Sequence, residues 1–331
     1  MKLFVYEHIT SGALAAQDLP ESLAQEGDSM LTTILQDLAE QPQLELFILR
    51  DSRLAEIDSL PHHSSCELFW VQNTEQFDQQ WEAAIQQADN TLVIAPETDA
   101  QLTKIQQDIS DRDKTYLGSS QKATLISTDK LRCSQHLLAH DIATVKTQTV
   151  TQWQKYSVDN ADGFVIKPID GAGCLDTMLF QTTDEADDYL QKMSPDQLLS
   201  LIVQPYIKGS AASLSLFISD NMVNLLSINR QKIKQQKSQL IFCGCDVNAI
   251  SASELSQRDA QQIADEIYKA LPGLWGFVGI DLVLTSSGPI VIEINPRLTT
   301  SYIGLKSTLS FNPTDLLIKH MHEKTPTRLA S

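Results

Sequence analysis

The first hundred residues alternate short apolar runs with amphipathic stretches. Four apolar runs are typical of strands buried on both faces, namely Leu3–Tyr6, Leu44–Leu49, Glu67–Val71 and Thr91–Ala95. Between them, Ser29–Glu40 and Thr74–Ala88 carry apolar residues at helical spacing. Strand–helix alternation of this kind predicts a parallel sheet with helices packed on it, which is an α/β domain.

From Leu117 onwards, strands dominate. The predicted strands are Thr144–Val150, Gly163–Lys167, Thr177–Gln181, Leu201–Gln204, Ser213–Ser219, Met222–Asn229 and a final pair near 276–294. The predicted helices are Asp129–His140, capped by Ser127 or Thr128, and Thr183–Met193, Leu255–Ala270 and Pro313–His322. The Lys- and Gln-rich stretch Gln231–Gln239 is predicted to be an exposed, mobile loop. Runs of strands with segregated helices predict an α+β unit with antiparallel sheets.

Charge and cysteine content narrow the class of protein. The 331 residues include 42 acidic and 25 basic ones, which gives a formal net charge of −17. Nucleic acids and anionic membranes attract cationic surfaces, so we expect neither as a partner. Five cysteines without regular spacing do not indicate a disulfide framework, and no run approaches the ~18 apolar residues of a membrane span. We therefore expect a cytoplasmic enzyme or binding protein.

Two acidic residues interrupt a pair of apolar strands near the C-terminus. Residues 276–295 contain two β-branched runs around a turn of Ser, Gly and Pro, which predicts a β-hairpin. If Leu284 faces Ile290 across the turn, Asp281 lies directly opposite Glu293. In an alternative register shifted by one residue, the two acids fall on opposite faces as unrelated surface charges.

Opposed carboxylates repel each other unless a cation bridges them. Asn295 lies two residues beyond Glu293 and shares its face. The oxygen donors of Asp281, Glu293 and Asn295 suit Mg²⁺, or Mn²⁺ in its place, with phosphate oxygens completing the coordination shell. The hairpin therefore predicts a metal site.

A lysine within an apolar strand precedes a small glycine loop. Burying the Lys167 ammonium is costly unless an anion pairs with it. The loop residues Gly171, Ala172 and Gly173 allow close backbone approach, and their N–H groups can form a nest for phosphate oxygens. A hairpin turn is the alternative explanation of the glycines. Lys130, early in a predicted helix, is by itself more typical of a solvated surface lysine.

A proline breaks another apolar strand. Pro205 follows Gln204 and precedes Tyr206 and Ile207. The break leaves backbone donors and acceptors free, as the edge of an adenine ring requires. A purely structural strand end explains the same residues equally well.

Two arginines follow or end predicted strands. Arg297 comes after a proline that ends the strand of Asn295, where its guanidinium is suited to stabilise charge on a transferring phosphoryl or acyl oxygen. Arg230 lies at the end of another strand and is a candidate clamp for a substrate carboxylate. A structural strand end is the alternative for Arg230.

The order of these motifs resembles the ATP-grasp superfamily of carboxylate–amine ligases. The resemblance runs from about Leu117 to about His322 and rests on Asp129-Lys130, Val165–Pro168, Asp170–Gly173, Gln204–Ile207, Asp281 and Glu293–Arg297. It implies a pre-ATP-grasp α/β domain at residues 1–112 and a two-part ATP-grasp domain at 113–331. Within the second domain, it implies a lid at about 144–204 and a C-terminal subdomain at about 205–322.

The same resemblance implies roles for single residues. Lys130 and Lys167 would contact the phosphates of ATP beneath the glycine loop, and the backbone near Tyr206 would hold adenine. Arg297 would stabilise an acyl-phosphate and the tetrahedral intermediate formed from it. The metal would be held by Asp281, Glu293 and Asn295. No acidic residue follows Gly209, where such enzymes often bind ribose, so the ribose-binding residue stays unassigned.

A narrower resemblance is to the tyramine–glutamate ligases of methanofuran and methylofuran biosynthesis. It rests on Glu293–Leu305, Asn229-Arg230-Gln231 and the loop Glu7–Gly12. It implies amide formation between L-glutamate and an amine, tyramine or tyrosine, through an acyl-phosphate with release of ADP and phosphate. Ligation of another amino acid or a peptide, a small-molecule kinase, and a nucleotide sensor without turnover are the alternatives. A homodimer is one candidate assembly, and the oligomeric state stays open.

Overall fold

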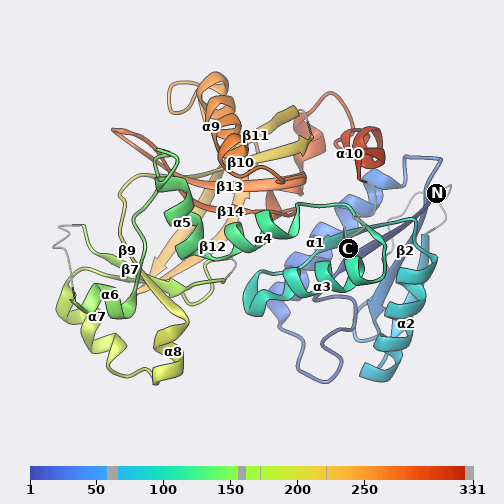
Figure 1. The fold of residues 1–331 in the computed structure, drawn as a ribbon, viewed down its shortest axis with the longest axis horizontal. Coiled ribbons are helices and arrows are strands. Elements are labelled where there is room, and N and C mark those ends of the chain that lie inside the picture. The colour runs from blue at the N-terminus through green and yellow to red at the C-terminus, as the bar shows by residue number, and fades with distance from the viewer. Residues whose placement is uncertain (58–65, 156–161, 172, 221, 325–331) are drawn as a thin grey trace, which may run out of the picture.

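The computed structural model describes residues 1–57, 66–155, 162–171, 173–220 and 222–324. The described residues form two sheets, one in each half of the chain. Figure 1 shows the blue N-terminal sheet and its helices at the right, the green-to-yellow segment at the lower left, and the orange strands above and between them. Among the described helices, none is long and apolar enough to cross a membrane.

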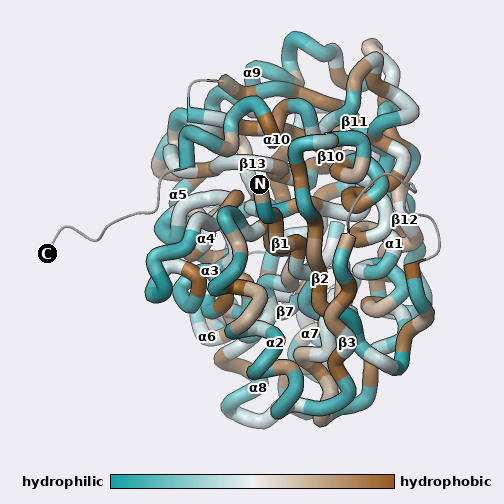
Figure 2. Tube along the Cα trace, turned by 90° about the vertical axis from the view of Figure 1, so that its right-hand side faces the viewer, coloured by the Kyte–Doolittle hydropathy of each residue, from teal (hydrophilic) through white to brown (hydrophobic). Residues whose placement is uncertain are grey.

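The first sheet is parallel and has the strand order β3-β2-β1-β4-β5. Its strands are β1 (Lys2–Glu7), β2 (Glu45–Asp51), β3 (Cys66–Val71), β4 (Asn90–Ile94) and β5 (Thr115–Tyr116). Its helices are α1 (Glu21–Leu38), α2 (Thr74–Gln87) and α3 (Gln101–Asp111), with the 3₁₀ turn η1 (Thr98–Ala100). Figure 2 shows the apolar colour running along β1 and β2, as expected for strands covered on both faces. The predicted α/β fold is confirmed.

Helix α1 begins at Glu21, well before the predicted Ser29. Its first half contains Gly27, where an added Cβ would lie 2.7 Å from the carboxyl carbon of Glu7. A polar first turn and a glycine carry no apolar periodicity, so the hydrophobic pattern does not reveal this part of the helix. The close contact holds α1 against the end of β1.

The second sheet is antiparallel and has the order β14-β13-β10-β11-β12-β8-β7-β9-β6. Its strands are β6 (Gln148–Thr149), β7 (Phe164–Pro168), β8 (Met178–Phe180), β9 (Leu201–Pro205), β10 (Ser210–Ser219), β11 (Met222–Gln236), β12 (Gln239–Asp246), β13 (Gly276–Thr285) and β14 (Gly288–Asn295). The helices around it are α4 (Gln121–Thr128), α5 (Lys130–Leu138), α6 (Val150–Lys155), α7 (Thr183–Leu190), α8 (Pro195–Leu199), α9 (Gln257–Ala270) and α10 (Thr314–His320). Three 3₁₀ turns near the C-terminus are η2 (Thr300–Tyr302), η3 (Leu305–Thr308) and η4 (Met321–Glu323). The predicted α+β architecture is confirmed.

The predicted N-cap of helix α5 is wrong. Asp129 caps this helix, because its carboxylate accepts the backbone N–H of Arg132 at 2.9 Å. Ser127 and Thr128 belong to the preceding helix α4, where their hydroxyls donate to carbonyls one turn earlier. Because the two short helices meet at Asp129, hydroxyl residues at the end of α4 resemble a cap for α5.

One predicted strand and one predicted loop are also wrong. The predicted strand Thr144–Val150 contains only the short β6, and Val150 begins helix α6. The predicted loop Gln231–Gln239 is a hairpin in which β11 and β12 pair as far as Gln236 and Gln239. Its polar side chains are exposed, but ladder hydrogen bonds between strands do not depend on side-chain hydropathy.

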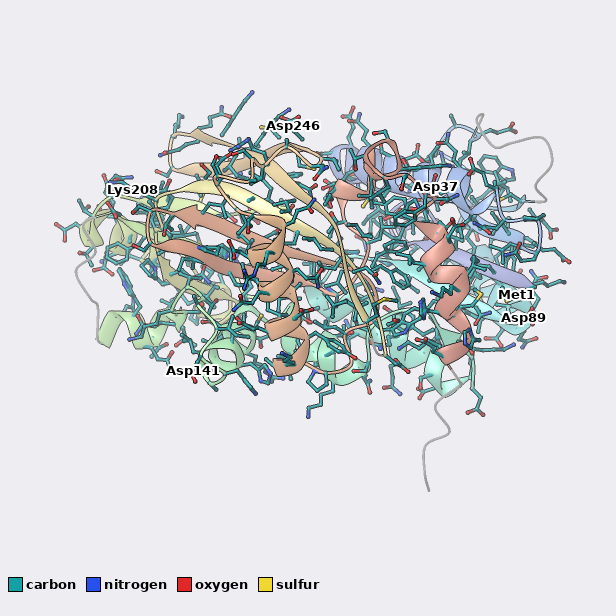
Figure 3. The ribbon with its side chains drawn as sticks, turned by 90° about the horizontal axis from the view of Figure 1, so that it is seen from above. Met1, Asp37, Asp89, Asp141, Lys208 and Asp246 are labelled. Carbon is teal, nitrogen blue, oxygen red and sulfur yellow. The ribbon has the colours of Figure 1, made fainter. Side chains whose placement is uncertain are left out.

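A core shared by both sheets joins the two halves of the molecule. It contains Leu3 and Leu31 from the first half together with Phe277 and Tyr302 from the second. The Tyr302 hydroxyl donates to the carboxylate of Asp37 at 2.8 Å. Figure 3 shows Asp37 near the C-terminal helix, with Lys208 and Met1 toward opposite ends of the molecule. The shared core therefore fixes the first sheet against the edge of the second that carries β13 and β14.

Candidate active site

The paired carboxylates lie on the β13–β14 hairpin. Near the turn the register differs by one residue from the prediction, because Leu284 pairs with Pro289 and not with Ile290. A β-bulge directly after Asp281 absorbs the difference, so that Asp281 pairs with Glu293 as predicted. The alternative arrangement with the two acids on opposite faces does not occur.

Two amides hold Asp281 beside Glu293. Gln231 Nε2 donates to Asp281 Oδ1 at 2.8 Å, and Asn295 Nδ2 lies 3.4 Å from Asp281 Oδ2. Desolvation, and then the nearby Glu293 charge, raise the pKa of Asp281 to about 8. The site therefore contains two carboxyl groups that resist ionising together unless a cation joins them.

Two buried lysines approach Glu293 from the other side. Lys130 Nζ lies 3.5 Å and Lys167 Nζ 3.8 Å from Glu293 Oε2. Desolvation opposes the ionised Glu293, but the two lysines outweigh it and hold the pKa of this carboxyl below its usual value. Desolvation also lowers the pKa of Lys167, with Glu293 acting in the opposite direction. The surface interpretation of Lys130 is wrong, since the side chain is only 7% exposed.

The donor set at the hairpin fits a divalent cation. Asp281 and Glu293 offer carboxylate oxygens, and Asn295 offers an amide oxygen, the hard ligands that Mg²⁺ prefers. Among the described residues, no three His, Cys, Asp or Glu side chains form a metal-binding group. Two carboxylates and one amide leave coordination positions for phosphate oxygens.

The glycine loop lies against the lysines. Lys130 Nζ donates to the carbonyl of Gly171, and the Lys130 backbone N–H donates to the carbonyl of Ile169 at 2.9 Å. Gly173 has a φ of +62°, which favours glycine, and nothing lies within 4 Å of an added Cβ. Ala172 lies outside the described residues. The loop connects the antiparallel strands β7 and β8, so the hairpin explanation of the glycines also holds.

A cavity of about 350 Å³ opens on the lysine side of the carboxylate pair. Lys130, Lys167, Asp281 and Glu293 line its polar end, and Gly171 lies beside them. Its other walls are mainly apolar and include Val145, Val165, Ile207, Leu240, Leu282, Val283 and Ile292. A long ligand with a charged tail and an apolar, flat head matches this division.

The predicted adenine segment lines this cavity. Gln204, Tyr206 and Ile207 all belong to its wall. Gln204 is buried and donates to the hydroxyl of Thr147 at 2.8 Å. The Tyr206 N–H donates to the carbonyl of Gly163 at 2.9 Å, so this donor is not free as predicted. Pro205 ends the strand at this segment, and the Tyr206 N–H fixes the segment to Gly163.

A smaller cavity of about 80 Å³ also has the carboxylate pair in its lining. It shares Asp281 and Glu293 with the larger cavity and adds Asn295 and Arg297. Its other polar walls come from Ser213, Gln231, Thr299, Thr300 and Ser301, and its less polar walls from Cys174, Phe242 and Cys245. Glu26 of α1 completes the lining from the first half of the chain. The two cavities therefore share the carboxylate pair in their linings, together with Gln231 and Cys174.

Arg297 is held by a residue from the first half of the chain. Arg297 Nε and Nη2 donate to the two carboxylate oxygens of Glu97 at 2.8 and 2.7 Å. Both side chains are buried, with 11% and 5% of their surfaces exposed. Bidentate pairing fixes the plane of a guanidinium. Arg297 is thus aimed at the smaller cavity by a partner beyond β4.

Comparison with known proteins fits this geometry. The model of the ATP-grasp domain matches residues 127–301, and that of the pre-ATP-grasp domain matches residues 44–124. The chain belongs to the ATP-grasp family. The predicted resemblance is confirmed, and with it the enzyme class of ATP-dependent carboxylate–amine ligase.

This ATP-grasp enzyme has relatives along nearly its whole length. The tyramine–L-glutamate ligase of Methanocaldococcus jannaschii is 26% identical over 317 residues, which cover 94% of this chain and 88% of the relative. An ATP-grasp superfamily protein from Archaeoglobus fulgidus is 25% identical with a TM-score of 0.71, covering 96% of this chain and 88% of that one. The D-alanine–D-alanine ligase of Bacillus anthracis complexed with ATP is 16% identical, has a TM-score of 0.62, covers 98% of both chains, and shows the shared fold.

Arg230 of this ATP-grasp enzyme is not brought to the site. Its guanidinium is paired with both carboxylate oxygens of Glu254 at 2.7 and 2.8 Å, and it lines neither cavity. Side chains alternate along β11, so Gln231 faces the site while Arg230 faces away from it. The neighbouring amide of Gln231, not the arginine, contacts Asp281.

Proposed function

We propose that this chain is a ligase that uses ATP to join a carboxylate of L-glutamate to an aromatic amine. Tyramine is the first candidate for the amine and tyrosine the second, in the biosynthesis of a methanofuran- or methylofuran-type cofactor. The observation that carries the proposal is the buried charge cluster of two lysines and two carboxylates between two cavities. It provides separate spaces for a nucleotide and for the reacting substrates.

The larger cavity suits ATP. Lys130 and Lys167 lie where they would contact phosphate oxygens, and the apolar walls near Tyr206 and Ile207 suit an adenine ring. The glycine loop would cover the phosphates and keep water from a reactive acyl-phosphate. Mg²⁺ bound by the carboxylate pair and Asn295 would neutralise phosphate charge.

The chemistry we propose has two steps. A substrate carboxylate oxygen attacks the γ-phosphorus, the bond to ADP breaks, and an acyl-phosphate forms. The amine nitrogen then attacks the acyl carbon, and phosphate leaves as the amide forms. Lys167 would position the phosphoryl group, and Arg297 would stabilise the negative charge that develops on the acyl oxygen.

Two observations support these substrates. Phe242 gives the smaller cavity an aromatic wall, and Arg297 is a cation beside it. The relative from Methanocaldococcus jannaschii, which covers nearly the whole chain, is named for tyramine and L-glutamate. Arg230 was the predicted clamp for the glutamate carboxylate, and we no longer assign it that role, because it lines neither cavity.

The experiment is coupled ADP release with Mg²⁺-ATP, L-glutamate and a panel of amines that includes tyramine and tyrosine. We expect ADP only when glutamate and one aromatic amine are both present, with the amide identified by mass spectrometry. Release that depends on a different amino acid would replace the substrate assignment. Phosphorylation of a hydroxyl compound without any amine would indicate a kinase, and ATP binding without ADP release would indicate a nucleotide sensor.

A further inference from the structure

The smaller cavity contains one acidic side chain, Glu26, that has no role in the function proposed above. It lies on helix α1, close to Gly27, whose contact with Glu7 fixes this part of the helix. Its side chain lines the cavity together with Arg297 and Asn295. Within the described part of the chain it makes no hydrogen bond and no ion pair.

The neighbouring cation is already engaged. Arg297 donates through Nε and Nη2 to Glu97 and through Nη1 to the carbonyl of Leu298, and among the described residues it forms no hydrogen bond or ion pair with Glu26. Desolvation raises the pKa of Glu26, and the more distant Arg297 charge only partly offsets it. A half-buried carboxylate without a partner in a reaction cavity is suited to receive a cation or a proton.

The position of Glu26 also defines a direction of approach. ATP phosphates in the larger cavity would reach the smaller one through Asp281 and Glu293, which line both. Because the nucleotide would fill the larger cavity, an amine would reach one face of the planar acyl carbonyl through the smaller cavity. Helix α1 contributes Glu26 to the lining of that cavity.

We propose that Glu26 binds the ammonium group of the incoming amine and accepts its proton before the amine attacks. This inference rests on the proposed ligase function and adds to it a residue that touches the second substrate. The inference implies that the amine binds in its protonated form and becomes a nucleophile only after Glu26 removes a proton.

The proton balance is complete. The amine arrives as R–NH₃⁺, and the Glu26 carboxylate takes one proton, leaving R–NH₂ with a free electron pair. This pair forms the bond to the acyl carbon while the bond from carbon to the phosphate oxygen breaks. The second nitrogen proton leaves with phosphate as HPO₄²⁻, and the Glu26 carboxyl then releases its proton to solvent.

Several ionisable groups surround Glu26 from the elements packed around the cavity. The cation is Arg297, and the other anions and thiols are Glu97, Asp281, Glu293, Cys174 and Cys245. Burial raises the pKa of both thiols, to about 12 for Cys174 and about 11 for Cys245. Asp281 and Glu293 are assigned to the metal, and Glu97 is bound by Arg297, which leaves Glu26 as the acceptor on the α1 side.

The test compares two nucleophiles in the wild type and in Glu26→Gln. The accepted amine is protonated at neutral pH and needs a base, whereas hydroxylamine is largely uncharged there and traps an acyl-phosphate directly as a hydroxamate. We expect Glu26→Gln to lower kcat/KM for the amine by roughly 100-fold, as for the loss of a general base. Hydroxamate formation should stay within about threefold of the wild type.

Each result decides the matter. Equal amide formation by Glu26→Gln and the wild type would overturn the inference. Equal loss of hydroxamate and amide would also overturn it, because Glu26 would then act on glutamate, ATP or folding. If the wild type forms neither product, the proposed ligase function fails and not the role of Glu26. Glu21→Gln, on the exposed start of the same helix, is the matched control and should leave both rates unchanged.

Discussion

At the scale of single residues, the site combines groups that are costly to bury one at a time. Asp281 and Glu293 are acceptable together because lysines lie on one side and amide donors on the other. Removing one member of such a cluster leaves its partners without compensation. In the proposed function, this cluster would couple charge balance to the binding of phosphate and metal.

Substitution of either carboxylate should stop turnover without unfolding the protein. We expect Asp281→Asn and Glu293→Gln each to lower kcat by at least about 100-fold, because both would remove a proposed metal ligand but keep the side-chain volume. ADP release measures the rate, and thermal unfolding measures the fold. Asp246→Asn, which breaks an exposed pair with Lys232 on the same sheet, is the control and should be active. Wild-type turnover in either site variant would refute the metal assignment.

The buried carboxyl group of Glu7 should make the stability of the protein depend on pH. Glu7 accepts the backbone N–H and the hydroxyl of Thr10 at 2.7 and 2.6 Å, and burial raises its pKa from 4.5 to about 7. Between these values the folded state keeps a proton that the unfolded chain has lost, so this carboxyl favours folding at low pH and its contribution is lost as the pH rises to about 7.

Urea unfolding at pH 5 and pH 8 checks this sign. We expect the free energy of unfolding of the wild type, relative to Glu7→Gln, to be lower at pH 8 than at pH 5. The comparison with the variant cancels the other titrating groups. Parallel curves for the two proteins, or a wild type relatively more stable at pH 8, would contradict the burial of Glu7 as an acid.

The sequence predicted the carboxylate pair for reasons only partly correct. Alternation along two strands placed Asp281 opposite Glu293, although the turn register was one residue off and a bulge restored the pairing. Gln231 was not predicted as a site residue, because an amide next to Arg230 carries no charge signal. Side chains alternate between the two faces of a strand, so Gln231 lies on the face of the buried Asn229 and Arg230 on the other. This alternation is the only sequence signal that could have distinguished Gln231 from Arg230.

At the scale of elements, the hairpin of β7 and β8 depends on a glycine. Gly163, at the start of β7, has a φ of +103°, and an added Cβ would lie 2.4 Å from the carbonyl oxygen of Phe180. Its own carbonyl accepts the N–H of Tyr206. The same residue therefore permits the pairing of β7 with β8 and holds the segment that lines the larger cavity.

Gly163→Ala should loosen this hairpin. We expect a loss of about 2 kcal/mol in the free energy of unfolding, from the left-handed backbone and the clash with a carbonyl oxygen that cannot easily move. The KM for ATP should rise as well. Gly244→Ala is the control, since its φ is +94° but nothing lies within 4 Å of the added Cβ. Equal losses in the two variants, measured by thermal unfolding, would show that close packing at Gly163 contributes nothing.

Element prediction succeeded where burial creates a pattern. The strands β1, β2 and β4 are buried on both faces and were found as apolar runs. The exposed hairpin of β11 and β12 was missed over Gln231–Gln239, because its strands are held by backbone pairing and not by apolar side chains. The first half of α1 was missed as well, because its polar first turn and Gly27 give no apolar periodicity.

At the scale of the whole molecule, the first half of the chain completes the active site of the second. Glu97 binds Arg297, and Asp170 of the glycine loop accepts the backbone N–H of Asp99 at 2.8 Å. Glu26 adds a third contribution. These contacts link residues far apart in the chain and without a shared motif, so the sequence alone could not reveal them.

Glu97→Gln should weaken the contact between the two halves of the chain that positions Arg297. Loss of the bidentate carboxylate frees the Arg297 guanidinium, and misplacement of such a group by about 1 Å costs up to ~100-fold in rate. We expect kcat to fall by about 10- to 100-fold with little change in the KM for ATP. Glu82→Gln breaks a more exposed carboxylate pair with Arg112 and is the control. Unchanged kcat in Glu97→Gln would exclude a positioning role for Glu97.

The most direct test of the account follows one oxygen atom. The ligase is supplied with Mg²⁺-ATP, the accepted amine and L-glutamate carrying ¹⁸O in its carboxylates. An acyl-phosphate route transfers one ¹⁸O from glutamate to the released phosphate, and mass spectrometry of that phosphate should show the label in step with amide formation. Unlabelled phosphate accompanying amide formation would contradict the acyl-phosphate and, with it, the division of the site into a nucleotide cavity and a substrate cavity.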